Sequence, residues 1–166
     1  SFNISPDGLT VAFAADRVTN EQHELWMAPI NGSVPTPVAL SGPVVAGVNP
    51  AYQWAPNSGR VVFATQKTVG VTELYSIGTA MGSPLVTLSG TLVSGGDVAT
   101  IFQISPDSTR VVFRADKDTD GVDELYSAPI ATANATTKLS GPLVVGGNVN
   151  FGFLISPDST RVVFLA

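Results

Sequence analysis

Residues 104–113 read Ile-Ser-Pro-Asp-Ser-Thr-Arg-Val-Val-Phe, and residues 155–164 repeat this stretch without a change. Looser copies start at Ile4 and Trp54, which places the prolines of the motif at positions 6, 56, 106 and 157. The repeat length is therefore about 50 residues, and self-similarity at such a period is typical of propellers and other repeat folds. The repeat, more than any single motif, decides the fold class.

Each copy predicts four short strands. The first is an aromatic–polar–apolar triplet such as residues 102–104, and a Pro-Asp turn follows it, because Pro presets φ and Asp can bond nearby backbone N–H groups. The second strand, residues 111–113, is apolar at every position, which indicates burial on both faces. The third strand opens on Glu-Leu-Tyr at 124–126, and the fourth ends at Leu139 before Ser-Gly.

Four strands per copy with Gly-rich connections and no helical period indicate an all-β chain, a β-propeller of four-stranded antiparallel blades. A β-solenoid is the competing fold, but its coils are usually shorter, about 20 to 30 residues. We expect one propeller segment over 1–166, with three blades followed by the first two strands of a fourth. The expected limits are 1–42, 50–90, 100–141 and, for the half blade, 151–166.

This count predicts an incomplete ring, because propellers close with about four to eight blades. The strand at 162–164 would then lie at an open apolar edge, and such an edge is a template for association. We therefore expect the residues to be a segment of a longer propeller that can self-associate through its open edges.

Composition excludes several kinds of partner and site. Charged residues make up 13% of the chain, against about 25% on average, and the net charge is −5 with no basic patch, so no nucleic-acid partner is expected. No apolar segment is long enough to span a bilayer. The absence of cysteine excludes disulfides and thiol chemistry. Abundant Val, Thr, Ser, Gly and Ala with few Lys favours an extracellular, cell-surface or periplasmic protein.

The Ser-Pro-Asp turn, the apolar strand after it and the Glu-Leu-Tyr strand together resemble TolB-type β-propeller repeats. Repeats of the same type form the propeller domains of prolyl oligopeptidase-like peptidases. The resemblance covers essentially the whole chain in four successive copies, and the second copy departs from it with Ala55-Pro56-Asn57 and a shorter loop. It implies a ring that binds partners on its faces or in its central channel, and it carries over no individual site residue.

The loop after the second strand of copy three carries the most specific local signal. Residues 116–121 place carboxylates at the first, third and fifth positions and then a glycine, a pattern that suits an oxygen-ligand loop for Ca²⁺. It resembles the calcium loops of integrin-type propeller repeats. The expected ligands are Asp116, Asp118, Asp120, the carbonyl of Val122 and Glu124. The alternative is an ordinary Asp- and Gly-containing hairpin loop, since copies one and two do not keep the ligand set.

A glutamate opens the third strand in every complete copy, at Glu24, Glu73 and Glu124. These side chains could form a ring of carboxylates. The structural alternative is that each accepts hydrogen bonds from a neighbouring loop or pairs with an arginine. The candidate partners precede the second strand, at Arg60, Arg110 and Arg161.

No set of residues predicts catalysis. His23, the only histidine, lies at the end of a variable loop, and the chain has no Gly-x-Ser-x-Gly elbow, so we expect a solvent-facing loop residue rather than a general base. The aspartates of the Pro-Asp turns are expected to cap those turns. Aromatic residues on the first and third strands are expected in the core or between blades before any glycan-stacking role: Trp26, Tyr52, Trp54, Tyr75 and Tyr126.

These observations favour a non-catalytic extracytoplasmic binding or scaffold module whose loops engage a protein or glycan partner, with no cofactor other than the candidate Ca²⁺. Two alternatives remain open. One is the propeller part of a larger prolyl oligopeptidase-like hydrolase, and the other is a Ca²⁺-dependent adhesive repeat. Fold alone does not choose among them.

Overall fold

Four antiparallel sheets, without a helix, make up the part of the chain that the computed structural model describes, residues 1–33, 36–45 and 50–166. The first sheet has its strands in sequence order: β1 (Phe2–Ile4), β2 (Thr10–Ala15), β3 (Glu24–Pro29) and β4 (Val38–Ala39). The second sheet repeats this order: β5 (Ala51–Trp54), β6 (Arg60–Thr68), β7 (Val71–Gly78) and β8 (Leu85–Thr87).

The third sheet has the same meander: β9 (Val98–Ile104), β10 (Arg110–Ala115), β11 (Glu124–Pro129) and β12 (Thr137–Lys138). Its first strand starts at Val98, two residues ahead of the expected blade limit at 100. The last sheet has two strands, β13 (Phe153–Ile155) and β14 (Val162–Phe164). Each sequence copy therefore forms a sheet of its own, which confirms the partial propeller. The β-solenoid alternative is wrong, because no sheet in the described ranges is shared between copies.

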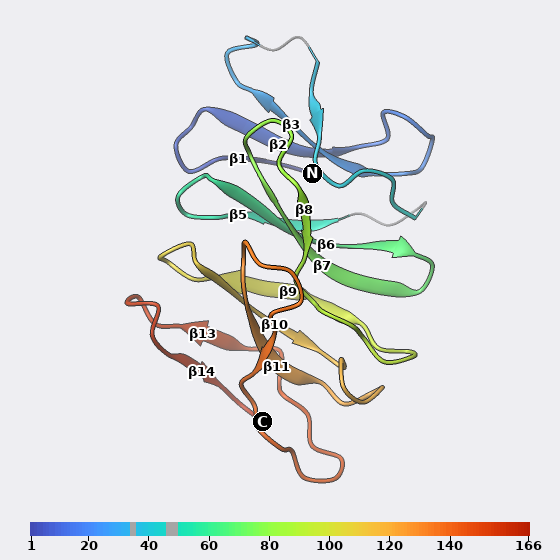
Figure 1. Cartoon of the computed structure of the whole chain (residues 1–166), viewed down its shortest axis with the longest axis vertical. Helices are drawn as coiled ribbons and strands as arrows, with labels where there is room; N and C mark the ends of the chain where they lie inside the picture. Colours follow the sequence, from blue (N-terminus) through green and yellow to red (C-terminus); the bar gives the residue numbers. More distant parts are fainter. Residues whose placement is uncertain (34–35, 46–49) are drawn as a thin grey trace.

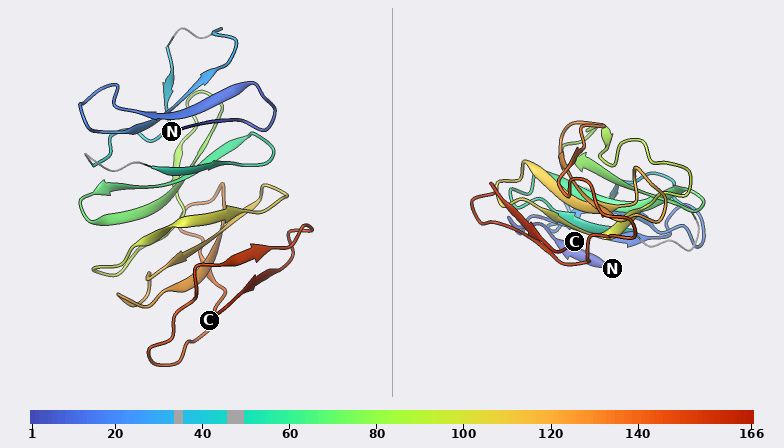
Figure 2. Two further views of the ribbon diagram at one scale, coloured as in Figure 1. Left: turned by 180° about the vertical axis from the view of Figure 1, so that it is seen from behind. Right: turned by 90° about the horizontal axis from the view of Figure 1, so that it is seen from below.

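The sheets stack side by side along the long axis of the molecule, with the first sheet at one end and β13–β14 at the other (Figure 1, Figure 2). This stacking covers the inner sheets on both faces. Val61 and Phe63 pack in a cluster with residues of the first sheet, whereas Val62 packs in a cluster with residues of the third. Val-Val-Phe is therefore fully buried in β6, as its unbroken apolar sequence predicts.

Polar residues in the middle of the first strands join one blade to the next. The Gln53 side chain donates a 2.8 Å hydrogen bond to the carbonyl of Phe102, and Gln103 makes the same 2.8 Å bond to Phe153. The polar position of the aromatic–polar–apolar triplet therefore points along the stack toward the neighbouring blade.

A second link between blades runs through the Pro-Asp turns. Ser58, Ser108 and Ser159 adopt positive φ angles of 60°, 62° and 61°, a region that normally favours glycine. Each hydroxyl accepts a 3.0 Å hydrogen bond from the backbone N–H at the second turn position of the preceding blade. The serine thus serves its own turn and the adjacent one, a double role that the sequence pattern of a single turn does not reveal.

Candidate functional site

The acidic loop between β10 and β11 is held by its own backbone and by lysines. Asp116 accepts a hydrogen bond of 2.5 Å from the N–H of Asp97 and one of 3.0 Å from the N–H of Gly121. Both of its carboxylate oxygens are therefore engaged with backbone groups. Asp116 closes its own loop and ties it to the segment that leads into β9.

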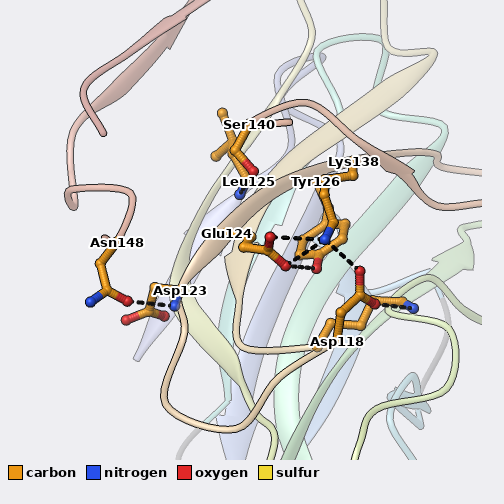
Figure 3. Close-up of polar contacts among 9 residues, drawn as sticks. Asp118, Asp123, Glu124, Leu125, Tyr126, Lys138, Ser140 and Asn148 are labelled. Carbon is orange, nitrogen blue, oxygen red and sulfur yellow. Dashed lines mark hydrogen bonds and ion pairs between the residues drawn. The ribbon is translucent and has the colours of Figure 1, made fainter. Parts of the chain in front are cut away.

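Lys138 places its ammonium group between two of the predicted calcium ligands (Figure 3). Its Nζ lies 2.8 Å from Asp118 and 2.8 Å from Glu124, and the Tyr126 hydroxyl donates a 2.7 Å hydrogen bond to the same glutamate. The ion pair with Lys138 lowers the pKa of Asp118, and the two carboxylates raise the pKa of Lys138. The ammonium group of a β12 side chain thus lies between carboxylates that the sequence pattern predicts to bind a metal ion.

In the described residues, Lys138 forms an ion pair with neither Asp116 nor Asp120. Asp120 is exposed, and its carboxylate lies against Gly95, where an added Cβ would come within 2.8 Å of it. Within the described ranges, no group of three or more His, Cys, Asp or Glu side chains is arranged to hold a metal. The calcium site therefore stays a prediction, and Ca²⁺ binding there would require displacement of Lys138.

Of the structural alternatives for the strand-opening glutamates, pairing with an arginine is not seen among the described residues. Arg110 donates to Ser127 at 3.0 and 2.6 Å, and Arg60 donates to Ser76 at 2.7 Å. The cause is antiparallel register: Arg110 lies opposite Pro129, while Glu124 lies opposite Ala115 at the other end of the strand pair. The glutamates instead accept hydrogen bonds from the tyrosine two residues further along β7 or β11.

The corresponding position of the second blade is open. Glu73 accepts a 2.5 Å hydrogen bond from Tyr75, as Glu124 does from Tyr126, and beside it lies a pocket of about 660 Å³. The pocket includes residues of the second blade, of the segment that joins it to the third, and of the β11–β12 loop. Its lining includes Thr68, Glu73, Leu85, Thr87, Val93 and Asn134. Burial raises the pKa of the Tyr75 hydroxyl, with the neighbouring glutamate adding to the effect.

At the equivalent position of the first blade, the glutamate has different surroundings again. Trp26 stands where the other blades have tyrosine, so no hydroxyl is offered to Glu24, which is 4% exposed. One buried carboxylate oxygen of Glu24 has no hydrogen-bond partner among the described residues. The same holds for Nδ1 of His23, so no carboxylate orients this ring as a Ser-His-Asp arrangement requires.

The aromatic side chains belong mainly to the core. Trp26, Trp54, Tyr75 and Tyr126 are each at most 8% exposed, and Tyr52 is half-buried and packs against the cluster between the first and second blades. Such burial favours the core role that the sequence predicts over a glycan-stacking surface. Cations near the end of the second strand cover three of these rings: Arg17 lies 4.6 Å from Trp26, Lys67 of β6 lies 5.5 Å from Tyr75, and Lys117 lies 5.9 Å from Tyr126.

Fold and site together define a stack of propeller blades with polar clusters, formed by strand and loop residues, around the glutamates of the third strands. No protein-family model and no curated protein matches the chain. Among solved structures, one assigned as TolB from Agrobacterium tumefaciens is similar, with a TM-score of 0.60 at 20% identity over 98% of this chain and 52% of that one. TolB from Acinetobacter baumannii matches with a TM-score of 0.56 at 15% identity, over 99% of this chain and 37% of that one.

A structure from a study of two prolyl endopeptidases also matches, with a TM-score of 0.52 at 13% identity over 86% of this chain and 22% of that one. The chain thus spans about half the length of the first of these proteins and less of the other two. At these identities the similarity shows the fold, and it confirms the resemblance to TolB-type propeller repeats at that level. In the described part of the chain, no helix is long and apolar enough to cross a membrane.

Proposed function

We propose that the chain is a non-catalytic, extracytoplasmic propeller module that binds a protein or glycan partner on a rigid frame of blades. The observation that carries this proposal is the open pocket at the boundary of the second and third blades. Its wall comes from loops and strand ends of two blades, and connecting loops on a rigid scaffold are where binding residues concentrate. In the strand behind it, β6, Val61, Val62 and Phe63 have no exposed surface, and such close packing favours a rigid frame.

Retention experiments test the binding function. The purified chain, immobilised, is exposed to a cell-envelope extract of the source cells and, separately, to a glycan array. We expect saturable retention of one protein or one glycan class. A variant with Leu154→Lys serves as a control for nonspecific apolar adhesion, because Leu154 is 70% exposed and lies outside the pocket. Failure to retain any ligand beyond the level of a blank surface would contradict the proposal.

The similarity to a prolyl endopeptidase favours a second candidate, the propeller part of a larger hydrolase. In that case the active site would lie in a different domain, encoded next to these residues. Determination of the coding sequence adjoining this segment distinguishes the candidates: a Gly-x-Ser-x-Gly elbow between a strand and a helix would favour the hydrolase. Further blades would favour the binding module.

Neither candidate gives the isolated chain a hydrolytic activity of its own. We expect peptidase, esterase and glycosidase substrates to be turned over no faster than in buffer, because His23 is the only histidine and lacks an orienting partner among the described residues. Activity that co-purifies with the chain and disappears in His23→Ala would contradict this expectation.

A further inference from the structure

We propose that the pocket beside Glu73 binds a primary ammonium group on an aliphatic stem, such as a lysine side chain of a protein partner. This inference rests on the proposed binding function and names the chemistry of its site. It comes from a comparison of two equivalent positions within the chain, one filled and one open.

The filled position is in the third blade. Lys138 of β12 pairs in register with Tyr126, and its ammonium group lies 2.8 Å from Glu124, which also accepts the tyrosine hydroxyl. The same nitrogen lies 5.8 Å from the centroid of the Tyr126 ring. A carboxylate, a phenol and an aromatic face thus surround one lysine headgroup, and each favours a cation.

The open position is in the second blade. Thr87 of β8 pairs in register with Tyr75, so it occupies the place that Lys138 has in the third blade. The carboxylate and phenol are retained, since Tyr75 donates to Glu73 at 2.5 Å. A threonine is too short to carry a charge to the glutamate. The 660 Å³ pocket marks the space that a longer cationic side chain would enter, and it falls within the range of about 300–1,000 Å³ of ordinary ligand pockets.

Glu73 has no ion-pair partner among the described residues, although Lys67 on the adjacent strand acts on it electrostatically from a longer distance. The Glu73 side chain is half-buried, and no cation of the described residues lies within 4.0 Å of its carboxylate. Lys67 is the basic residue on the adjacent strand, but its Nζ donates a 2.5 Å hydrogen bond to the carbonyl of Ser41 on the first blade. A partly desolvated carboxylate without a close cation attracts one strongly.

The pocket favours lysine over arginine and over a small cation. One oxygen of Glu73 already accepts the Tyr75 hydroxyl, so a bidentate fork from a guanidinium would have to share that oxygen at a fixed geometry, whereas an ammonium acts as a point charge. Apolar side chains in the lining, Val71, Leu85, Leu92 and Val93, provide a surface for the methylene stem. A metal ion would find one carboxylate here, too few ligands for Ca²⁺ or Mg²⁺.

Titration with capped tripeptides, followed by NMR of the labelled chain, tests the proposal. Acetyl-Gly-Lys-Gly-amide should bind saturably, with shifts centred on residues that line the pocket. Its Nε-acetylated form should bind at least about tenfold more weakly, a loss of roughly 1.4 kcal/mol, and the arginine peptide should be weaker than the lysine peptide. Equal binding of the acetylated peptide, or no saturable binding of the lysine peptide, overturns the proposal.

Two variants and a control sharpen the test. Thr87→Lys should fill the pocket with its own ammonium group, abolish peptide binding and raise the melting temperature, since it reproduces the pairing of Lys138 with Glu124. Glu73→Gln should abolish binding without filling the pocket. Thr100→Lys adds the same charge on an exposed position outside the pocket and should bind the peptide like the wild type. Unchanged binding by Thr87→Lys would overturn the assignment of the site.

The same variants separate this inference from the proposed function. If the wild type and Thr87→Lys retain a natural partner equally, the pocket does not take part in recognition of that partner. The proposed binding function would still hold. Loss of the partner in Thr87→Lys and Glu73→Gln, with retention by Thr100→Lys, would support both.

Discussion

Asp107 stabilises its turn by accepting hydrogen bonds from a serine hydroxyl and from a backbone N–H group. Its carboxylate accepts from the Ser105 hydroxyl at 2.5 Å and from the N–H of Thr109 at 3.0 Å, and Asp7 and Asp158 repeat this arrangement. The serine hydroxyl is the largest cause of the lowered pKa of all three aspartates, followed by the backbone N–H. The capping role expected from sequence is confirmed. Asn57 makes the same backbone bond at 2.9 Å without a charge.

Acid should therefore weaken the fold through these turns. The folded-state pKa of each aspartate lies below 3.8, the value for the unfolded chain, so the unfolded state binds protons first as the pH falls. Their contribution is fully present above the unfolded pKa and is lost as the pH drops through the folded one. Melting temperatures measured between about pH 6 and pH 2.5 should fall less steeply for the triple variant Asp7→Asn, Asp107→Asn and Asp158→Asn. Parallel curves would contradict this assignment.

At the scale of strands and turns, the same sequence has different surroundings in different copies. Val-Val-Phe is buried at 61–63, yet in β14 the identical triplet leaves Val163 71% exposed. The strand itself is predictable from its residues, because β-branched and aromatic side chains favour a pleated, packed surface. Its burial is not, since that depends on a neighbouring blade that the local sequence does not contain.

The turn serines give a prediction at this scale. Ser108 has a φ of 62° and accepts the N–H of Asn57 from the preceding blade. Ser108→Ala keeps the strained backbone and loses the hydrogen bond, so it should lower the free energy of unfolding by about 1 kcal/mol. Ser108→Gly also loses the bond but relieves strain of similar size, and should remain within about 0.5 kcal/mol of the wild type. Urea denaturation measures both, and a larger loss for the glycine variant would contradict the argument.

The acidic loop shows what a sequence motif alone does not predict: the side chains that a paired strand brings to it. The alternating aspartates before Gly121 are visible in the sequence, but their cation comes from Lys138, which reaches them only because β12 pairs with β11. A motif of consecutive residues cannot reveal a partner that strand pairing supplies. The open pocket of the second blade was missed for the same reason: its signal is the difference between Thr87 and Lys138 at aligned positions, which appears once the strand registers are known.

The prediction of a calcium site can be tested against the alternative that the Lys138 ammonium group is the resident cation. If Ca²⁺ binds the loop, removal of the resident ammonium group should help it, so calcium should raise the melting temperature of Lys138→Ala more than that of the wild type. Asp118→Ala, which removes a proposed ligand, should show no calcium-dependent increase. Magnesium at equal concentration controls for ionic strength. A melting temperature that does not change with calcium in the wild type and in Lys138→Ala would exclude the site.

At the scale of the whole molecule, the two ends of the stack differ from its interior. Phe2 and Ile4 share one face of β1 and are 78% and 50% exposed. At the other end, Leu154 and Val163 lie opposite each other across β13 and β14 and are 70% and 71% exposed. In the interior of the stack both faces are covered by a neighbouring blade: Phe63 and Phe113, on the face equivalent to that of Phe2, have no exposed surface. Val62 and Val112, equivalent to Val163, are at most 3% exposed. Each end therefore presents an apolar surface shaped to receive a blade.

These end faces should make the isolated chain self-associate. Burial of each such side chain would stabilise a contact by about 1.5–3 kcal/mol, and packing of one end on the opposite end of a second copy would give a head-to-tail arrangement that can continue. Light scattering should therefore give masses above the 17.1 kDa of one chain, rising with concentration. Leu154→Lys combined with Val163→Lys should shift the population toward 17.1 kDa, because two ammonium groups on one face cannot be buried without partners. Thr100→Lys, which changes charge away from both end faces, should leave the association unchanged. A wild-type chain that stays monomeric and melts cooperatively at high concentration would show that the exposed ends do not drive assembly.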